Sequence, residues 1–187
     1  MTYVFDTGAF IVLKNYYPGA FSSLWTRIDA LAANGTLTSV REVFTQKSVT
    51  CATQRHLHHR APKLETCRLS WRLLSNELHN YNDSDYIQDW AKQHKAIFAP
   101  PSNDELLVVQ QILAIPHFQT LIGNKAILKG TPVADPFVVA AGKVKESIVV
   151  TQEVPKPNAA KVPNVCLHFG VPCINLESFM TQQGWSF

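Results

Sequence analysis

Short apolar runs alternate with longer stretches of helical periodicity along most of this chain, and this alternation constrains the fold more than any other feature. Four runs are typical of buried strands: Tyr3–Phe5, 36–40, 147–151 and 171–174. Between them lie stretches with apolar residues at helical spacing, the clearest of which cover residues 21–34, 83–94 and 103–115. Such an alternation predicts an α/β fold, with helices on both faces of a central parallel sheet in a three-layer α/β/α arrangement.

Polar and small residues mark the expected ends of several helices. Ser22 is the expected cap of the first predicted helix, and Gly35 is its expected stop. The stretch Ser-Asn-Asp-Glu at residues 102–105 is a capping-box pattern. Asp135 followed by Pro136 predicts another helix start, with the aspartate as the cap and the proline at the first helical position.

The length and composition are those of one ordinary globular domain. The chain has 187 residues, of which 46% are hydrophobic and 17% charged, so residues 1–187 are predicted to fold around a single core. No basic segment precedes the first apolar run, which Asp6 interrupts early, so no signal peptide is expected. The apolar stretch 136–141 is too short for a membrane span. We therefore predict a cytoplasmic protein without a membrane partner, whose four cysteines are reduced thiols.

Residues 46–73 do not follow the alternation. This segment has no sustained apolar period and carries six Lys and Arg residues against one Glu, whereas the net charge of the whole chain is only +3. It also interrupts the helix that residues 41–44 begin, so we interpret it as a basic insertion. Its cysteines and histidines match no standard zinc spacing, which favours a solvated loop, with contact to RNA phosphates as an alternative.

Acidic residues follow several of the predicted strands. Asp6 ends the first strand, Glu42 and Glu153 each follow a strand by two residues, and Asp135 opens a predicted helix. Because ligands gather at the carboxyl ends of parallel strands, these four acids are expected to converge. Clustered carboxylates repel one another, and a divalent cation relieves that repulsion; ligands that are all oxygen suit Mg²⁺ or Mn²⁺. The four acids are therefore the predicted catalytic and metal-binding residues.

The stretch Asp-Thr-Gly-Ala that starts at Asp6 has other readings. It is a motif of aspartic proteases, but these are all-β proteins that need a second such aspartate or a dimer, and the helical stretches argue against them. Phosphatases of the haloacid-dehalogenase kind use an aspartate after a strand as the nucleophile, but they need a second aspartate two residues on, where this chain has Gly8. A third reading is a structural aspartate that caps the turn after the strand.

Five stretches together resemble the PIN domain. They are VFDTGAFI, SVREVF, ADPFVVAAGKV, IVVTQE and the tail KVPNVCLHFGVPCINLESF…GW. The sequence is similar to a PIN-like family, long described as a domain of unknown function, that is related to VapC-type toxins. The resemblance covers nearly the whole chain outside residues 46–73.

This resemblance implies a metal-dependent endoribonuclease. In PIN nucleases the metal-site acids lie at positions that match Asp6, Glu42 and Asp135, and Glu153 is the candidate for a fourth, more variable acid. Mg²⁺ or Mn²⁺ would activate water for attack on an RNA phosphodiester, leaving 5′-phosphate and 3′-hydroxyl ends.

The kinship with toxins also implies partners. RNA would be the substrate, a cognate antitoxin protein would block the acidic site, and a homodimer is a further expectation because PIN nucleases often dimerise. Two hydroxyl groups, those of Thr7 and Thr151, are expected to orient water or phosphate.

The main alternative is a catalytically degenerate PIN-like module that binds RNA or a protein without cutting. The basic insertion begins a few residues after Glu42, where it could displace that acid or cover the RNA groove.

Overall fold

The computed structural model describes residues 1–44, 86–121 and 133–185. Within them the chain forms a parallel five-stranded sheet with the strand order β3-β2-β1-β4-β5. The strands are β1 (Tyr3–Phe5), β2 (Leu37–Val40), β3 (Phe98–Ala99), β4 (Ile148–Val150) and β5 (Cys173–Ile174). The predicted α/β fold with a central parallel sheet is confirmed.

The strand order reverses at β1. The chain runs outward from β1 through β2 to β3, and then returns to the other side of β1 to form β4 and β5. Tyr3 therefore lies opposite Leu37 on one side and Ile148 on the other. In open α/β sheets, ligands bind beyond the carboxyl ends of the strands where the order reverses. The topology thus directs attention to the edge just after Phe5 and Val150.

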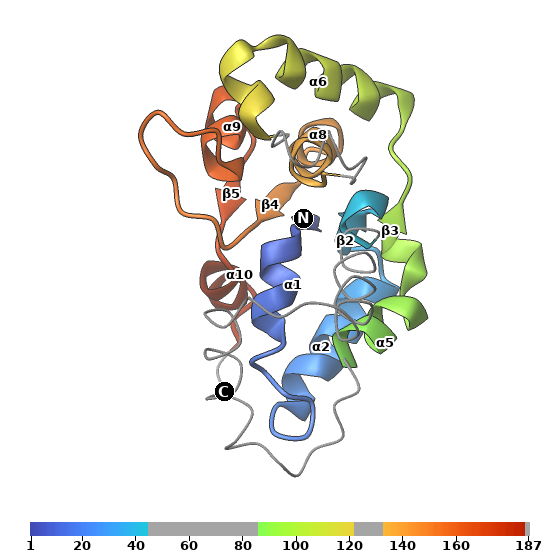
Figure 1. Ribbon diagram of the computed structural model, residues 1–187. Coiled ribbons are helices and arrows are strands. Elements are labelled where there is room, and N and C mark those ends of the chain that lie inside the picture. The colour runs from blue at the N-terminus through green and yellow to red at the C-terminus, as the bar shows by residue number, and fades with distance from the viewer. Residues whose placement is uncertain (45–85, 122–132, 186–187) are drawn as a thin grey trace, which may run out of the picture.

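Helices cover both faces of the sheet and complete the three layers (Figure 1). One face carries α8 (Asp135–Val144) and α9 (Val162–Phe169), with α6 (Asn103–Ala114) packed outside α8. The opposite face carries α1 (Thr7–Leu13), α2 (Ser22–Ala33) and α10 (Leu176–Gln182), with α5 (Tyr86–Gln93) beside α2. Two 3-10 turns are η1 (Lys95–Ile97) and η2 (Pro116–Leu121), and residues 41–44 are helical.

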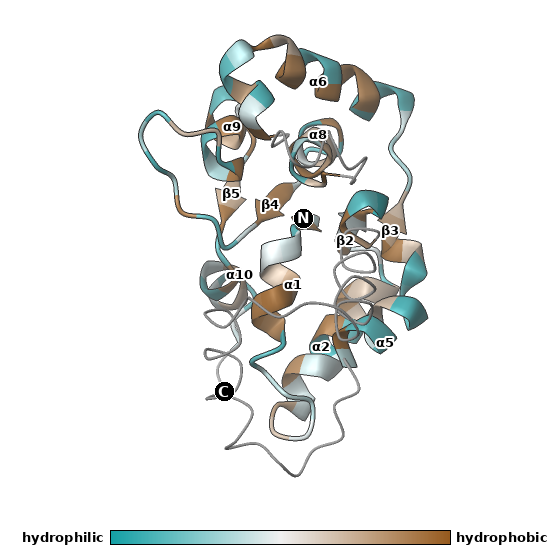
Figure 2. Cartoon of the chain, viewed as in Figure 1, coloured by the Kyte–Doolittle hydropathy of each residue, from teal (hydrophilic) through white to brown (hydrophobic). Residues whose placement is uncertain are grey.

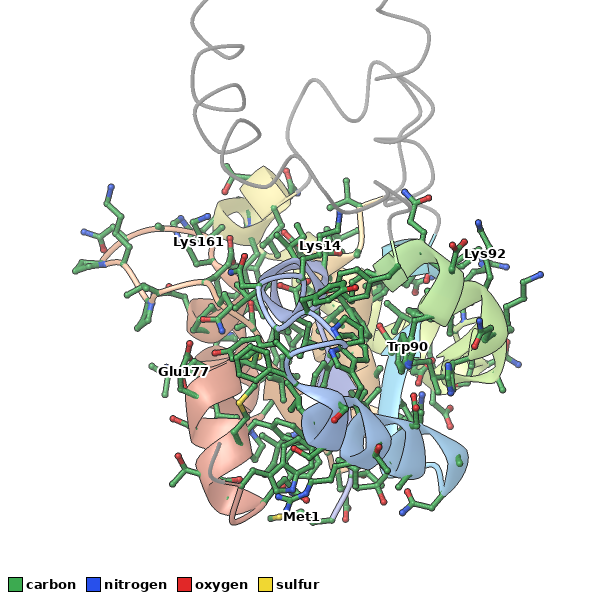
Figure 3. The ribbon with its side chains drawn as sticks, turned by 90° about the horizontal axis from the view of Figure 1, so that it is seen from below. Met1, Lys14, Trp90, Lys92, Lys161 and Glu177 are labelled. Carbon is green, nitrogen blue, oxygen red and sulfur yellow. The ribbon has the colours of Figure 1, made fainter. Side chains whose placement is uncertain are left out.

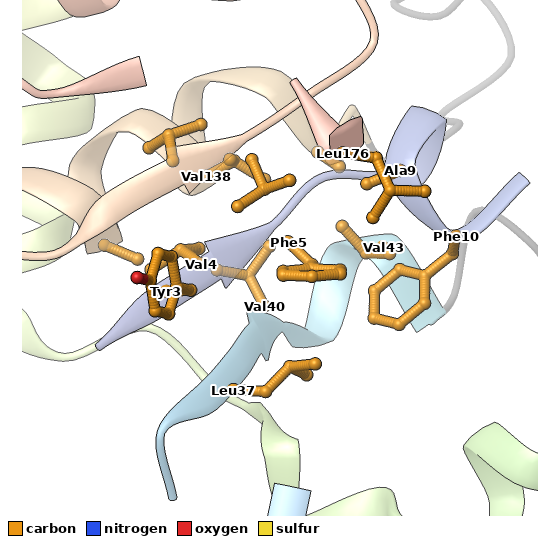
Figure 4. Packing of buried hydrophobic residues seen from close by; sticks show 14 of the residues in the cluster. Tyr3, Val4, Phe5, Ala9, Phe10, Leu37, Val40, Val43, Val138 and Leu176 are labelled. Carbon is orange, nitrogen blue, oxygen red and sulfur yellow. The ribbon is translucent and has the colours of Figure 1, made fainter. Parts of the chain in front are cut away.

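The core lies between the sheet and the apolar sides of these helices (Figures 2 and 4). Val4 and Phe5 of β1 are completely buried. The ring of Phe5 packs against those of Phe10 in α1 and Phe179 in α10, with centroids 5.6 and 5.0 Å away. Burial of each such side chain stabilises the fold by about 1.5–3 kcal/mol. These contacts hold β1, the strand that ends in Asp6, at the centre of the molecule.

Two of the predicted helix ends are confirmed. The Ser102 hydroxyl accepts a hydrogen bond from the backbone N–H of Glu105 at 3.2 Å, and the Glu105 carboxylate accepts one from the Ser102 N–H at 2.8 Å, which is a complete capping box. Gly35 follows α2 with φ of +74°, a conformation that favours glycine at the end of a helix.

Two other predicted caps are wrong. Ser22 lies inside α2, and Phe21 occupies the cap position. Asp135 is the first residue of α8, and Ala134 occupies the cap position there. Asp135 is therefore not the cap residue, and its carboxyl group accepts a hydrogen bond from its own backbone N–H.

The sequence patterns do not predict α1 or β3. The residues of α1, Thr-Gly-Ala-Phe-Ile-Val-Leu, are almost all apolar and therefore show no clear helical periodicity. The chain turns into a helix instead because Asp6 caps it and because Ala9, Phe10 and Leu13 all face the core. Contact with the sheet, rather than local periodicity, decides this element.

Some predictions concern residues outside the described part. The structure does not describe residues 45–85, so the basic insertion at 46–73 and the first residues of the helix predicted at 83–94 stay predictions. Cys166 and Cys173 are free thiols.

The parallel sheet with helices on both faces is not the all-β architecture that the aspartic-protease reading requires. In the ranges that the structure covers, no helix is both long and apolar enough to cross a bilayer.

Gly142 tests how tightly α8 packs on the sheet. A Cβ atom at this position would lie 2.6 Å from Val149 Cγ2 and 2.9 Å from Val171 Cγ1. We expect Gly142→Ala to lower the free energy of unfolding by about 1–2 kcal/mol, because overpacking outweighs the gain of about 1 kcal/mol in helix propensity. Urea unfolding measures this loss.

The double variant Gly142→Ala/Val149→Ala is the control. It removes one of the two colliding methyl groups, so it should lose less stability than the sum of the two single variants. A Gly142→Ala protein more stable than the wild type would contradict close packing at this position.

Candidate functional site

The four predicted acids all lie just after strands or at helix starts on the carboxyl side of the sheet. Asp6 directly follows β1 and is only 4% exposed. Glu42 lies in the helical turn after β2 and is 6% exposed. Asp135 begins α8 and Glu153 lies in the loop after β4, both half-buried. They differ in what surrounds each carboxyl group.

Asp6 joins β1, α1 and β4. Its backbone N–H donates to the Val150 carbonyl at 2.9 Å, which extends the β1–β4 pairing by one residue. Its Oδ1 accepts from the Thr7 N–H at 2.6 Å, so it caps α1. Its Oδ2 accepts from the Thr151 hydroxyl at 2.7 Å. The structural reading of Asp6 as a cap is therefore correct as far as it goes, but it accounts for only one of the two oxygens.

Burial raises the pKa of Asp6 above its ordinary value, although hydrogen bonds from Thr151, Thr7 and Gly8 act in the opposite direction. The negative charge of Glu153 raises this pKa further. Gly8 lies close to the carboxylate, since a Cβ there would be 3.4 Å from Asp6 Oδ2. A glycine at this position leaves space beside the carboxylate.

The carboxyl group of Asp135 is also strongly perturbed, with a pKa raised to about 7. Burial is the largest cause, followed by repulsion from Asp6 and from Glu153. The positive charge of Lys161 partly offsets these effects. Asp6, Asp135 and Glu153 are remote in sequence, yet the fold brings them within electrostatic reach of one another.

Glu153 is held by three partners. Its backbone N–H donates to the Thr151 hydroxyl oxygen at 3.2 Å, so that one hydroxyl links Asp6 to the chain at Glu153. Its Oε1 lies 2.6 Å from Lys161 Nζ, and its Oε2 accepts from the Val162 N–H at 2.7 Å. Both carboxylate oxygens therefore have partners at the start of α9.

Glu42 stands apart from the other three acids. Its Oε1 pairs with Arg41 Nη2 at 3.1 Å, while its Oε2 is buried and has no hydrogen-bond partner. Glu42 is not among the charges that raise the pKa of Asp6 or Asp135. The structure thus brings together three of the four predicted residues, while Glu42 stands apart from them with one carboxylate oxygen that lacks a hydrogen-bond partner.

The donor set fits a hard divalent cation in its chemistry. All four side chains offer carboxylate oxygens, the ligands that Mg²⁺ and Mn²⁺ favour, and the buried Oε2 of Glu42 lacks a partner. The raised pKa values of Asp6 and Asp135 show that their negative charge is under-compensated. Among the residues that the structure covers, no three Asp, Glu, His or Cys side chains are yet grouped closely enough to hold a metal ion. Side-chain movement would have to bring the ligands together.

Two residues of the site have roles that the sequence reasoning did not assign. Thr151 was expected to orient water or phosphate, but its hydroxyl hydrogen is directed to Asp6. The sequence interpretation of Lys161 is a surface lysine, with contact to a phosphate as the alternative, whereas in the structure its ammonium group contacts Glu153 and lowers the pKa of Asp135. The sequence signal that could have indicated this contact is the position of Lys161 directly before the Val162-Pro163 helix start, eight residues after Glu153.

The fold and the site define a class: an α/β protein whose parallel sheet carries interacting carboxyl groups where its strand order reverses. Residues 3–50 and 63–187 match the family described as "Domain of unknown function (DUF4411)", and the chain belongs to this family. The gap between the two matched stretches, residues 51–62, lies within the segment 46–73. No curated protein matches the chain.

The raised pKa of Asp135 predicts how stability depends on pH. The folded protein holds this proton up to about pH 7, whereas the unfolded chain releases it near the ordinary value of 3.8. The proton on Asp135 therefore stabilises the metal-free fold at low pH, and this contribution is lost as the pH rises towards 7 and above. Between pH 5 and pH 8 we expect a loss of about 2–3 kcal/mol from this group.

Asp135→Asn should lack that loss, so its stability relative to the wild type should rise between pH 5 and pH 8. Urea unfolding in EDTA at both pH values measures the difference. Asp89→Asn is the matched control, because Asp89 is an exposed carboxylate paired only with exposed Lys92. The same pH dependence in wild type and Asp135→Asn would contradict the prediction.

The Thr151 hydroxyl should stabilise the fold through Asp6. Thr151→Val keeps the shape of the side chain but leaves the buried Asp6 Oδ2 without its donor. We expect a loss of about 1–3 kcal/mol, which grows as the pH rises through the raised pKa of Asp6, because the hydroxyl stabilises the charged carboxylate. Thr151→Ser keeps the hydroxyl and should retain most of the stability. Equal losses for the serine and valine variants would point to packing instead.

Proposed function

We propose that this chain is a metal-dependent endoribonuclease of the PIN type. The observation that carries the proposal is the meeting of Asp6, Asp135 and Glu153, which come from three separate elements, beyond the ends of β1 and β4. Parallel α/β sheets place their ligand sites at such a point of reversal. The sequence resemblance to PIN nucleases implies metal-site acids at Asp6 and Asp135, with Glu153 as the candidate for a more variable fourth acid.

In this proposal Asp6 and Asp135 hold Mg²⁺ or Mn²⁺ directly, and Glu42 and Glu153 complete the site or hold its waters. Thr151 keeps Asp6 in place through its hydrogen bond. The burial of Asp6 lowers the local dielectric, which strengthens its attraction for a cation.

When bound, the ion would lower the pKa of a water molecule that it holds and would place positive charge opposite the phosphoryl oxygens of RNA. The acids of this chain orient that centre, and their own protons must leave first. Because the pKa of Asp135 is about 7 without metal, cation binding competes with protonation there and should weaken below pH 7.

A toxin of a toxin–antitoxin pair is the proposed biological role, with a cognate antitoxin that covers the acidic edge. This part of the proposal rests on the resemblance to VapC-type toxins. The RNA substrate is proposed on the same basis.

A second candidate is a PIN-like module that binds RNA or a protein without cutting. The observation that favours it is that Glu153 already has partners for both oxygens and that the acids of the described residues do not yet form a metal-holding group. Such a module would retain RNA in filter binding, with or without metal, and leave it intact.

Cleavage of purified tRNA and ribosomal RNA distinguishes the two candidates. We expect the wild type to cut RNA with Mn²⁺ and not with EDTA. Asp6→Asn and Asp135→Asn should each lower the rate by at least about a hundredfold, because each removes a charge from the centre that stabilises the transition state. Asp89→Asn should cut like the wild type, because it changes an exposed carboxylate that pairs with Lys92 and not with the acids of the site.

The ends of the products test the mechanism. A 5′-phosphate and a 3′-hydroxyl are expected, and a 2′,3′-cyclic phosphate would rule out attack by metal-activated water. If the full chain cuts nothing, the assay is repeated after deletion of residues 46–73. Silence of both proteins would favour the binding module.

A further inference from the structure

Lys161 places a positive charge on the acidic site. Its Nζ atom lies 2.6 Å from Glu153 Oε1, and its charge also lowers the pKa of Asp135. The side chain is 45% exposed, and Figure 3 labels it on the surface seen from below. Arg41 pairs with Glu42, the acid that stands apart. Within residues 1–44, 86–121 and 133–185, Lys161 is the basic side chain that pairs with Glu153 and lowers the pKa of Asp135.

The backbone fixes where this lysine starts but not where its ammonium group must remain. Lys161 occupies the cap position of α9 in an extended conformation, and Pro163 follows at the start of the helix. The next residue, Val162, donates its N–H to Glu153 Oε2. The four-carbon stem of a lysine can nevertheless move its charge by several ångströms while the backbone stays in place.

This ion pair and a divalent cation would need the same carboxylate oxygen. Glu153 Oε1 accepts a hydrogen bond from the Lys161 ammonium group, and Oε2 accepts one from the Val162 N–H. The backbone N–H cannot move away without moving the chain, whereas the lysine side chain can. A partly exposed ion pair contributes little stability, about 1 kcal/mol or less, so a stronger cation can displace it. Removal of the lysine contact is therefore the smaller change that frees Glu153 for a metal ligand role.

We propose that Lys161 is an internal counter-cation that holds Glu153 in the metal-free protein and must release it when a divalent cation binds the acidic site. The inference rests on the proposed metal site and adds a residue that controls its occupancy. In the metal-free state the Glu153 carboxylate is committed to an ion pair within the chain.

Lys161→Met tests the proposal, because methionine keeps an unbranched stem and removes the charge. Isothermal titration with Mn²⁺ at pH 8 measures the dissociation constant of the metal-free protein, and Mn²⁺ electron paramagnetic resonance measures free ion independently. We expect Mn²⁺ to bind about three- to tenfold more tightly to Lys161→Met than to the wild type, because the competing cation is gone. Lys161→Arg keeps a cation and should bind like the wild type or more weakly.

Lys156→Met is the matched control. Lys156 lies in the same loop and is exposed, and its recorded hydrogen bonds use its backbone, which contacts Asn164. The substitution changes the net charge of the protein by the same amount as Lys161→Met. An equal tightening in both variants would show a general charge effect and would overturn the proposal.

Three further outcomes would overturn it. Unchanged Mn²⁺ affinity in Lys161→Met would mean that the lysine does not compete with the ion, and weaker affinity would mean that it orients Glu153 as a ligand. Binding of Mn²⁺ by neither protein would also overturn it. Circular dichroism and thermal melting first establish that each variant is folded.

Failure of this inference and failure of the proposed nuclease are separable. RNA cleavage that requires Mn²⁺ and Asp135, together with unchanged Mn²⁺ affinity in Lys161→Met, would remove the inference alone. Tighter Mn²⁺ binding in Lys161→Met without any RNA cleavage would retain the counter-cation and remove the nuclease.

Discussion

The pairing of β1 with β4 is the interaction on which the site depends. The hydrogen bond from the Asp6 N–H to the Val150 carbonyl carries this pairing one residue past the end of β1, and so sets Asp6 beside Thr151. The Thr151 hydroxyl can then donate to Asp6 and accept from Glu153. The same pairing exists only because the strand order reverses at β1. A sheet without that reversal would leave these residues apart.

Electrostatic repulsion follows directly from this geometry. The fold buries Asp6, places Asp135 and Glu153 within reach of its charge, and raises the pKa of both aspartates. Hydrogen bonds from Thr151 and Thr7 offset part of the cost at Asp6, and Lys161 offsets part of it at Asp135. A protein selected for stability alone would have little reason to assemble such a group, whereas sites that bind cations or move protons commonly do.

Local sequence predicted some of the contacts between near neighbours correctly, but not all of them. The capping box at Ser102 and Glu105 was predicted correctly because both hydrogen bonds lie within four residues. The α1 segment was missed because its apolar letters suit a buried strand as well as a buried helix, and only the contact of Phe10 with the core distinguishes them. Asp135 was assigned as a cap because Asp before Pro is common there, yet the helix begins at the aspartate itself.

By itself the sequence determined that helices and parallel strands alternate and that acidic residues follow the strands, because both features arise from patterns a few residues long. It also placed Asp6, Glu42, Asp135 and Glu153 on the carboxyl side of the sheet, where they are found. Only the tertiary structure decided that Asp6, Asp135 and Glu153 interact while Glu42 stands apart, and that Thr151 and Lys161 are their partners. The reason is physical: Asp6 and Thr151 are 145 residues apart in sequence, and their contact depends on strand order and burial that no local pattern encodes.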